Sequence, residues 1–353
     1  MTTTSLRLAW ETPTWWWRPS MAPLPLLRDL RVHTVAFVTN RRPSAAVRLA
    51  ASFNPGVRVL VLAPRSQKDR VEQLGATWAD FNQHANHTAA FEVGFKQGSP
   101  GSRHYHTFCH VRWLALASAL REQPLPADGA VAILDDDVLL FERLGERLQE
   151  AAAFHPTANA ETVLSGAFVL TSAGALERMA AFLCALYALP SDDLGAVAWR
   201  YGEPKPLASL AERDRKRIHP AFRRGGQFAR FSDMDAIEAF RLLSRSGELP
   251  LGLRARWAAG HRCPSCIHAP KVEKLGILDA AWRANTSFSL TGQPDVDDSP
   301  RQSSEPHLSW HGSIPRLEPA GKPLCFLHLQ GPHAKQRLLM PMLAKVGLPP
   351  GLL

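Results

Sequence analysis

The chain has 353 residues, of which 45% are hydrophobic and 21% charged, the balance of a folded globular protein and not of a disordered one. A net charge of +9 and a pI of about 9.7 favour an anionic partner, such as a nucleotide diphosphate, an acidic lipid or nucleic acid. The five cysteines are spread along the chain and argue against a secreted disulfide framework. No stretch has the uninterrupted apolar length of a signal peptide or a membrane span, so a cytoplasmic protein is expected.

The first 30 residues contain four prolines between positions 13 and 25, which interrupt any helical or strand periodicity. Trp15, Trp16 and Trp17 lie in this arm. They could touch a lipid interface as a peripheral membrane contact, although covering a hydrophobic face of the protein is the commoner outcome. The expected organisation is an irregular N-terminal arm over residues 1–30 and one α/β domain over residues 31–353 with a decorated C-terminal half.

A parallel sheet is predicted from the segments that follow the arm. Val32–Thr39 is rich in β-branched residues, Ser44–Phe53 has helical character, and Val57–Leu62 is a second apolar run. Short apolar strands on both sides of a helix are typical of a βαβ unit. Phe108–Leu120 is apolar almost all round and predicts a buried helix, and Ala130–Leu134 predicts the next strand.

The second half of the chain alternates further helices and strands with polar segments. Ser191–Gly226 is expected to be charged and rich in loops, and residues 291–323 to form a long surface excursion. The remaining predicted elements are helices over Glu142–Ala153, Ala173–Leu189, Asp233–Ser244 and Lys335–Lys345, a strand over Glu161–Thr171 interrupted at Ser165-Gly166, and a strand over Pro323–Leu329.

Three consecutive carboxylates follow the predicted strand that ends at Leu134. Side chains alternate along a strand, so Asp135 and Asp137 are expected on the same side, with Asp136 between them. Adjacent like charges are costly unless a cation neutralises them, and carboxylate oxygens suit Mn²⁺ or Mg²⁺. An acidic turn or a helix N-cap is the commoner reading of an isolated Asp-x-Asp, but the apolar runs on both sides favour a metal site here.

A second polar cluster closes the predicted strand near the C-terminus. His328 ends an apolar run, a Gly331-Pro332 turn follows, and Lys335 comes four residues after the glycine. A neutral imidazole can complete a coordination shell begun by carboxylates. A lysine near a helix start can meet phosphate charge with the help of the helix dipole. Taken alone, His328 is more commonly a half-buried histidine without a ligand.

Together these motifs resemble the GT-A nucleotide-diphospho-sugar glycosyltransferases that contain a DxD motif. The resemblance is carried by Arg112-Trp113 in a helix, the strand end Leu134–Val138, and the late segment Leu327–Lys335. Ser165-Gly166 and Ser232–Met234 stand in the order that such enzymes show. The resemblance spans most of the chain and implies a Rossmann-like α/β fold with a mixed, mostly parallel sheet flanked by helices.

The resemblance also implies a role for each matching residue. Asp135 and Asp137 would hold the metal on the donor diphosphate, and His328 would be the third protein ligand. The donor-binding residues would be Thr39 and Asn40 near the base, Arg112 on the nucleotide or sugar, Asp135 near the ribose, Gly166 at the donor sugar and Lys335 on the phosphates. Asp233 would be the general base for an acceptor hydroxyl or a hydrogen-bond partner of the sugar, although Ser-Asp before a helix is more often an N-cap.

The implied reaction is a hexosyl or related transfer from a nucleotide sugar, with Mn²⁺ or Mg²⁺ and Lys335 stabilising the departing nucleoside diphosphate. UDP-sugars are the common donors of metal-dependent GT-A enzymes. The acceptor could be a glycan, a protein, a lipid or a metabolite. Asp136 adds a charge where many members of the family carry a small or neutral residue.

Three other functions compete with this interpretation. His261, Cys263, Cys266 and His268 could bind zinc, but one compact cluster lacks the two separated ligand pairs of a usual zinc module. A basic protein that binds nucleic acid or an anionic surface would suit the charge, yet no nucleic-acid motif is present, so nucleic acid is the less favoured partner. A catalytically inactive GT-A-like protein is the third, and the retained metal ligands argue against it.

Overall fold

The computed structural model describes residues 31–43, 45–85, 88–136, 138–141, 143–144, 163–165, 168–245, 277–278, 307–311, 314–318, 322–323 and 326–328. Contacts divide the chain into two compact units. The first, here called the helical unit, comprises Met1–Leu24, His84–Ser118 and Gly174–His261. The second, the sheet unit, comprises Pro25–Gln83, Ala119–Ala173 and Arg262–Leu353. The expected arm over residues 1–30 lies outside the described residues, and the single domain over 31–353 stays a prediction.

The sheet unit is built on six strands in the order β3-β2-β1-β4-β7-β6. The strands β3, β2, β1 and β4 pair in parallel, and β7 runs antiparallel to both β4 and β6. Their bounds are Arg31–Val38 for β1, Arg58–Ala63 for β2, Thr77–Asp80 for β3, Gly129–Leu134 for β4, Val163–Ser165 for β6 and Phe168–Ser172 for β7. This mixed, mostly parallel sheet confirms the predicted α/β fold class.

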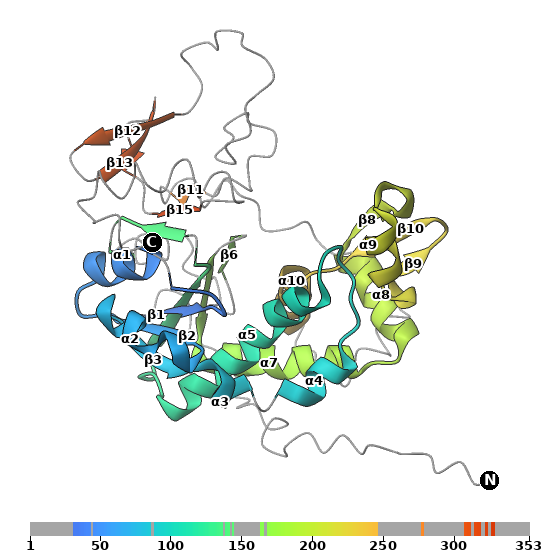
Figure 1. The fold of residues 1–353 in the computed structure, drawn as a ribbon, viewed down its shortest axis with the longest axis horizontal. Coiled ribbons are helices and arrows are strands. Elements are labelled where there is room, and N and C mark those ends of the chain that lie inside the picture. Colours follow the sequence, from blue (N-terminus) through green and yellow to red (C-terminus); the bar gives the residue numbers. More distant parts are fainter. Residues whose placement is uncertain are drawn as a thin grey trace. The chain divides into compact units, whose positions relative to one another are not determined.

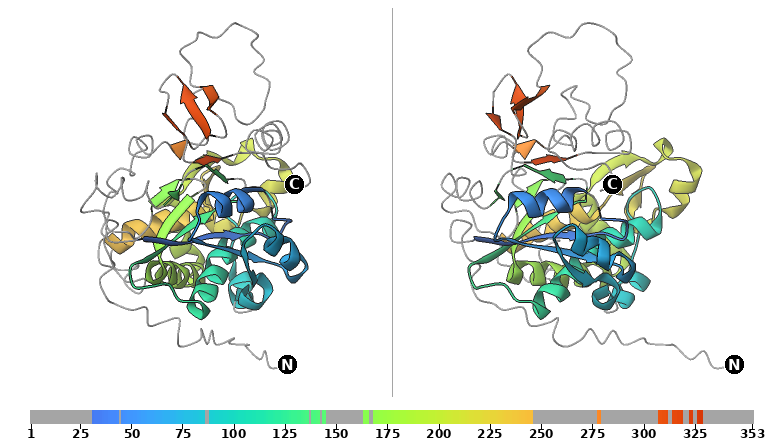
Figure 2. Two further views of the ribbon diagram at one scale, coloured as in Figure 1. Left: turned by 90° about the vertical axis from the view of Figure 1, so that its left-hand side faces the viewer. Right: turned by 60° about the vertical axis from the view of Figure 1, so that its left-hand side comes forward.

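Apolar sequence runs explain why β1 and β4 form the centre of the sheet. All six residues of β4 are buried, as are the last five of β1. Strands covered on both faces read as continuous apolar runs, because neither face meets water. Helix α1 (Ala45–Phe53) packs against β2, and α2 (Lys68–Gln73) packs against β3 (Figure 1; Figure 2). The predicted strand–helix–strand unit is therefore confirmed, within one residue at each predicted boundary.

Two smaller three-stranded sheets complete the described part of this unit. Their orders are β11-β15-β5 and β12-β13-β14. The bounds are Val138–Leu140 for β5, Ile277–Leu278 for β11, His307–His311 for β12, Ile314–Glu318 for β13, Lys322–Pro323 for β14 and Phe326–His328 for β15. The β12–β13 hairpin lies within residues 291–323, where a surface excursion was expected. The sequence analysis expected no strand there because Pro, Gly and Ser are abundant. The alternation of Leu308 and Trp310 with polar residues is too short to indicate one.

The helical unit holds most of the described helices and one small antiparallel sheet, ordered β8-β10-β9. The helices are α4 (Ala89–Gly94), α5 (Arg103–Glu122), α7 (Ala173–Ala188), α8 (Ser191–Tyr201), α9 (Glu212–Arg217) and α10 (Asp233–Arg245). The strands are β8 (Glu203–Pro206), β9 (Arg223–Arg224) and β10 (Gln227–Arg230). Short helical segments also occur as α3 (Phe81–Ala85), η3 (Arg65–Gln67), η5 (Leu207–Ser209) and η6 (Pro220–Phe222).

Regular structure over residues 191–230 differs from the loop-rich segment expected there. The small sheet has few buried side chains, chiefly Phe228 and Ala229, so its sequence carries little periodic signal. Likewise, Glu161–Thr171 was expected as one interrupted strand and instead contributes to the antiparallel pair β6 and β7. Gly166 and Ala167, which come between the two strands in the sequence, lie outside the described residues.

Close backbone packing in the helical unit depends on Gly195 in α8. A Cβ added at Gly195 would overlap the carbonyl oxygen of Ala221, whereas a Cβ on Gly174 in α7 would meet no atom within 4 Å. We therefore expect Gly195→Ala to lower the free energy of unfolding by about 1–3 kcal/mol through overpacking. Gly174→Ala, the matched control, should be neutral or stabilising by up to about 1 kcal/mol, because alanine favours helix. Urea unfolding of both variants tests this, and equal stabilities would contradict the close contact.

Candidate functional site

The carboxyl ends of β1 and β4 form one edge of the main sheet. The two strands are parallel neighbours, and Phe37 pairs with Leu134 near both ends. Thr39 and Asn40 therefore leave the sheet next to Asp135 and Asp136. In open α/β sheets, ligands bind outside the carboxyl ends of the strands. The structure thus places Thr39 and Asn40, predicted near the base, at the same sheet edge as Asp135, predicted to hold the metal on the diphosphate.

Thr39 ties the two strand ends together. Its side chain is buried, and its hydroxyl donates to Asp136 Oδ2 at 3.2 Å. The Thr39 Oγ1 also accepts from the Arg41 backbone N–H at 3.1 Å. Its own backbone N–H donates to the carbonyl of Leu62 in β2. The middle aspartate, Asp136, thus accepts a hydrogen bond from the residue that follows β1. This contact explains the extra charge of Asp136 as part of the loop architecture.

The acidic motif is a tight turn that leads into β5. The Val138 backbone N–H donates to the Asp135 carbonyl at 3.1 Å. Asp135 and Asp136 are half-buried, and Asp137 lies outside the described residues. Because β5 begins directly after the motif, the pairing of β5 with β15 fixes the position of the backbone at the end of the acidic turn.

Strand β15 pairs antiparallel with β5 and brings Leu327 and His328, the first two residues of the late motif, next to the strand that follows the acidic turn. Phe326 pairs with Leu140, Leu327 with Leu139, and His328 with Val138. His328 is thus registered against the residue that immediately follows the three aspartates. The strands β11 and β15 lie together next to β5 in the sheet unit (Figure 1). Two motifs from distant parts of the sequence therefore meet through backbone pairing.

The chemistry of these side chains suits a divalent cation. Asp135, Asp137 and His328 would offer carboxylate oxygens and one imidazole, a donor set that Mn²⁺ accepts. Among the side chains that the structure describes, no three His, Cys, Asp or Glu residues are grouped to hold a metal. Asp137 and the side chain of His328 lie outside that set. The donor types fit the predicted ion, and Mn²⁺ or Mg²⁺ stays a prediction.

Two cationic residues at this edge were missed by the sequence analysis. Arg41 and Arg42 follow Asn40 in the loop between β1 and α1, and all three are exposed. The available signal was a basic pair placed between a predicted strand end and a predicted helix start. Guanidinium groups at this edge add positive charge where an anionic ligand of the site would bind.

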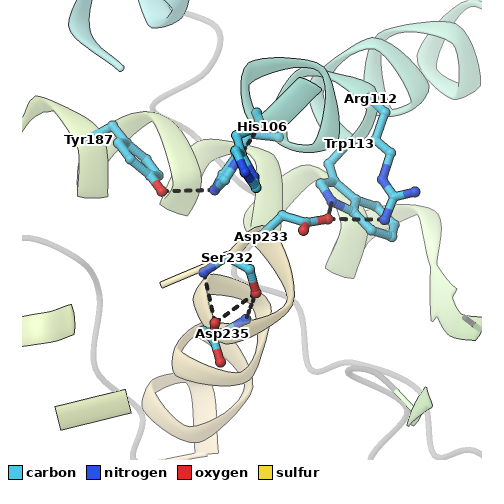
Figure 3. A network of polar contacts seen from close by, with 8 residues as sticks. His106, Arg112, Trp113, Tyr187, Ser232, Asp233 and Asp235 are labelled. Carbon is cyan, nitrogen blue, oxygen red and sulfur yellow. Dashed lines mark hydrogen bonds and ion pairs between the residues drawn. The ribbon is translucent and has the colours of Figure 1, made fainter. Parts of the chain in front are cut away.

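In the helical unit, Arg112 and Asp233 form a nearly buried ion pair (Figure 3). Arg112 Nη2 lies 3.0 Å from Asp233 Oδ2, with side-chain exposures of 14% and 9%. The indole N–H of Trp113 donates to the same oxygen at 3.1 Å. The Arg112 guanidinium also lies 4.6 Å from the centre of the Trp113 ring, within cation–π range. The predicted Arg-Trp motif on α5 thus holds the first residue of α10.

The N-cap of α10 is Ser232 and not Asp233. The Ser232 hydroxyl and backbone N–H both donate to Asp235 Oδ2 at 2.7 Å, and the Asp235 N–H points back to the Ser232 hydroxyl at 3.4 Å (Figure 3). This is a capping box, in which two orphan groups of the first turn satisfy each other. Asp233 is therefore released from capping and is available to bind Arg112 and Trp113.

Next to this ion pair in the helical unit lies a buried histidine with a defined tautomer. His110 is 1% exposed and stacks among the rings of Phe91, Phe95 and Tyr187. Its Nδ1 lies 2.8 Å from the His106 carbonyl, which can only accept, so Nδ1 carries the proton. The Tyr187 hydroxyl then donates to Nε2 at 2.8 Å. Burial lowers the pKa of His110 and raises that of Tyr187 well above its usual value.

The lowered pKa of His110 predicts a loss of stability in weak acid. The folded protein holds the imidazole neutral, whereas the unfolded chain takes up a proton below pH 6.5. The contribution of His110 is thus complete above pH 6.5 and is lost as the pH falls, at up to about 1.4 kcal/mol per pH unit. Urea unfolding at pH 7.5 and 5.5 should show a smaller decrease for His110→Gln than for the original chain. Since burial also lowers the pKa of His219, His219→Gln is measured alongside and gives the share of the decrease that belongs to the second histidine. Equal decreases for the original chain and His110→Gln would contradict the role of His110.

Several predicted site residues lie outside the described residues. These are Gly166, Lys335, Asp137, the cluster His261, Cys263, Cys266 and His268, and the tryptophans Trp15, Trp16 and Trp17. Asn40, Thr39 and Asp135 belong to the sheet unit, as does His328, whereas Arg112 and Asp233 belong to the helical unit. Each unit therefore contributes its own group of candidate residues.

None of the helices in the described part of the chain combines the length and apolarity needed to cross a bilayer. No model of a known protein family matches the sequence, and no curated protein matches it. Among solved structures, the chain is similar to the apo form of mouse xyloside xylosyltransferase 1, at 11% identity and a TM-score of 0.34. The alignment covers 61% of this chain and 82% of that one, and the similarity concerns the fold alone.

Proposed function

We propose that this chain is a metal-dependent glycosyltransferase of the GT-A type, which moves a sugar from a nucleotide-sugar donor, of the UDP-sugar class, to an acceptor hydroxyl. The observation that carries the proposal is the register of β15 on β5, which sets His328 opposite Val138 directly after Asp135–Asp137. The strand that ends at His328 pairs with the strand that directly follows the acidic turn, at the carboxyl edge of a parallel sheet. This arrangement supports the proposal of a cation site for a diphosphate.

In the proposed site, Asp135, Asp137 and His328 hold Mn²⁺ or Mg²⁺, which when bound supplies charge neutralisation for the diphosphate. Thr39 fixes the loop after β1 through Asp136 and the Arg41 N–H, so that Asn40 is presented to the nucleotide. Lys335 is proposed to meet the phosphate oxygens as the nucleoside diphosphate leaves, and Gly166 to allow close approach of the donor sugar.

In the proposed reaction, Asp233 is the candidate base for the acceptor hydroxyl, and Arg112 binds the nucleotide or sugar. Asp233 Oδ2 accepts from both Arg112 and Trp113, which holds the carboxylate in place and supports a positioning role for the arginine. The bond between the anomeric carbon and phosphate breaks, the acceptor oxygen bonds to that carbon, and its proton passes to a base. The role of Asp233 as base and the role of Arg112 in binding the donor rest on the sequence resemblance.

A thermal-shift screen of UDP, GDP, ADP and CMP, each with and without Mn²⁺, tests the proposal. A ligand that binds the folded state raises the melting temperature, by an amount set by its concentration relative to its Kd. We expect one nucleotide to raise the melting temperature in the presence of Mn²⁺ and not in EDTA, which also names the donor class. No shift with any nucleotide, or a shift that persists in EDTA, would contradict a metal-dependent transferase.

A further inference from the structure

The helical unit carries a concentration of positive charge that the proposed reaction does not use. Residues 203–230, which include β8, α9, β9 and β10, hold eight lysines and arginines against three acidic residues. That excess of five charges is more than half of the net +9 of the whole chain. We call this segment the basic module. Figure 1 labels its β9–β10 hairpin and the neighbouring α9.

The three carboxylates of the basic module are each shared or already paired. Glu203 faces both Lys205 and Arg230, and Asp214 faces both Arg213 and Arg217. Glu212 pairs with Lys216 at 2.6 Å. Internal pairing therefore leaves much of the positive charge of the module without a matching carboxylate inside it.

Arg215 and Arg223 are held by carbonyl oxygens, which orient a guanidinium without neutralising it. Arg223 donates to the carbonyls of Arg215 and Ile218, and Arg215 donates to the carbonyl of Leu210. Arg224 is exposed, next to the Gly225-Gly226 turn, where both glycines have positive φ. Arg215 in the helix α9 and Arg223 in the hairpin are thus held in place, and Arg224 is exposed to solvent.

Cations from outside the basic module lie close enough to His219, inside the module, to affect it. The pKa of His219 is lowered by burial and also by the charges of Lys96, Arg223 and Arg103. Arg217 donates to the carbonyl of Gly101, which ties α9 to the loop before α5. Three separate stretches of the helical unit, residues 96, 103 and 217–223, therefore contribute positive charge to one region.

Two exposed apolar side chains belong to the two segments that Arg103 joins. Val93 at the end of α4 is 79% exposed and Tyr105 in the first turn of α5 is 53% exposed. Arg103 links their segments, because its guanidinium donates to the carbonyl of Glu92. Basic side chains bind the negative headgroups of a membrane surface, and a tyrosine suits the boundary between headgroups and water.

We propose that the basic module, together with Val93 and Tyr105, docks the protein onto an anionic lipid surface. A bilayer uses both kinds of side chain, because cations meet the headgroups while Val93 and Tyr105 contact the interface. Nucleic acid would use the cations but favours aromatic residues interleaved with them, and Phe222 and Phe228 within the module are buried. This surface function is independent of the proposed transfer reaction.

The test is co-sedimentation of the full chain with vesicles of phosphatidylcholine alone and with one fifth phosphatidylserine. Binding should require the anionic lipid and should weaken at least about tenfold when sodium chloride rises from 0.1 to 0.5 M. Arg215→Glu with Arg224→Glu should weaken binding at least about tenfold. Arg31→Glu with Arg65→Glu, the matched control, changes net charge equally at exposed positions of the sheet unit and should bind within about twofold of the original chain. No binding to the anionic vesicles, or equal loss in both double variants, would overturn the proposal.

A second pair of substitutions separates a lipid surface from a nucleic-acid partner. Val93→Ser with Tyr105→Ser leaves every charge in place and should weaken vesicle binding severalfold. All three double variants must keep the melting temperature of the original chain, which confirms that the fold is intact. A single-stranded oligonucleotide is the comparison ligand. If the oligonucleotide binds more tightly than the vesicles, and neither binding is affected by the Val93 and Tyr105 changes, the surface is a nucleic-acid site and the proposal fails.

Discussion

Arg112→Ala is expected to lower the free energy of unfolding by about 3–5 kcal/mol, because it leaves the nearly buried carboxylate of Asp233 without its cation. Removing one partner of a buried ion pair costs more than the pair contributes, since the remaining charge stays away from water. The melting temperature should fall by about 6–20 °C on the scale of domains of 150–250 residues. Urea unfolding with far-UV circular dichroism measures the change.

A double-mutant cycle isolates the pair from the rest of the helix. Asp233→Asn in the Arg112→Ala background should restore part of the loss, because the amide no longer carries the uncompensated charge. Arg224→Ala is the matched control for removing an exposed arginine of the same unit and should change stability by less than about 0.5 kcal/mol. If Arg112→Ala costs no more than Arg224→Ala, the ion pair does not stabilise the fold.

Asp135→Ala and Asp137→Ala should each abolish the nucleotide shift that needs Mn²⁺ and reduce transfer by about 100-fold or more, because each removes a proposed metal ligand. The fold should persist with an unchanged or slightly higher melting temperature, since one of three repelling carboxylates is gone. The measurements are the thermal shift with Mn²⁺ and the turnover of the nucleotide sugar that the screen identifies.

Asp136→Asn is the matched control within the same motif. Its amide oxygen can still accept from the Thr39 hydroxyl, so the loop should keep its geometry while one negative charge is removed. We expect nucleotide binding and turnover within a few-fold of the original chain. If Asp136→Asn loses as much as Asp135→Ala, the assignment of the outer two aspartates as ligands is wrong.

The sheet was predictable because its strands are continuous apolar runs between short helices. The ends of β1 and β4 and the acidic residues after Leu134 follow from local pattern alone. The small sheet β8-β10-β9 was not predictable, because it is held by few buried side chains and by backbone packing at positions such as Gly202, next to the Arg230 carbonyl. Such contacts leave no periodic signature in a segment dominated by charge.

The candidate site was predictable in its residue types and not in its contacts. That Thr39 binds Asp136 depends on β1 and β4 being neighbours, which hydrophobic periodicity cannot specify. The pairing of His328 with Val138 likewise depends on a long-range strand register. In the helical unit, Ser232 and Asp235 form a local capping box that the spacing Ser-x-x-Asp could have indicated.

The central position of β1 has a consequence for biosynthesis. As the chain leaves the ribosome, β1 can pair with β2 soon after it emerges, but its other neighbour β4 begins only at Gly129. Until then, one edge of a strand whose second half, Val35–Val38, is apolar carries unpaired backbone groups, the feature that invites pairing with other chains. A nascent chain that pauses before Gly129 is therefore the species most in need of a chaperone.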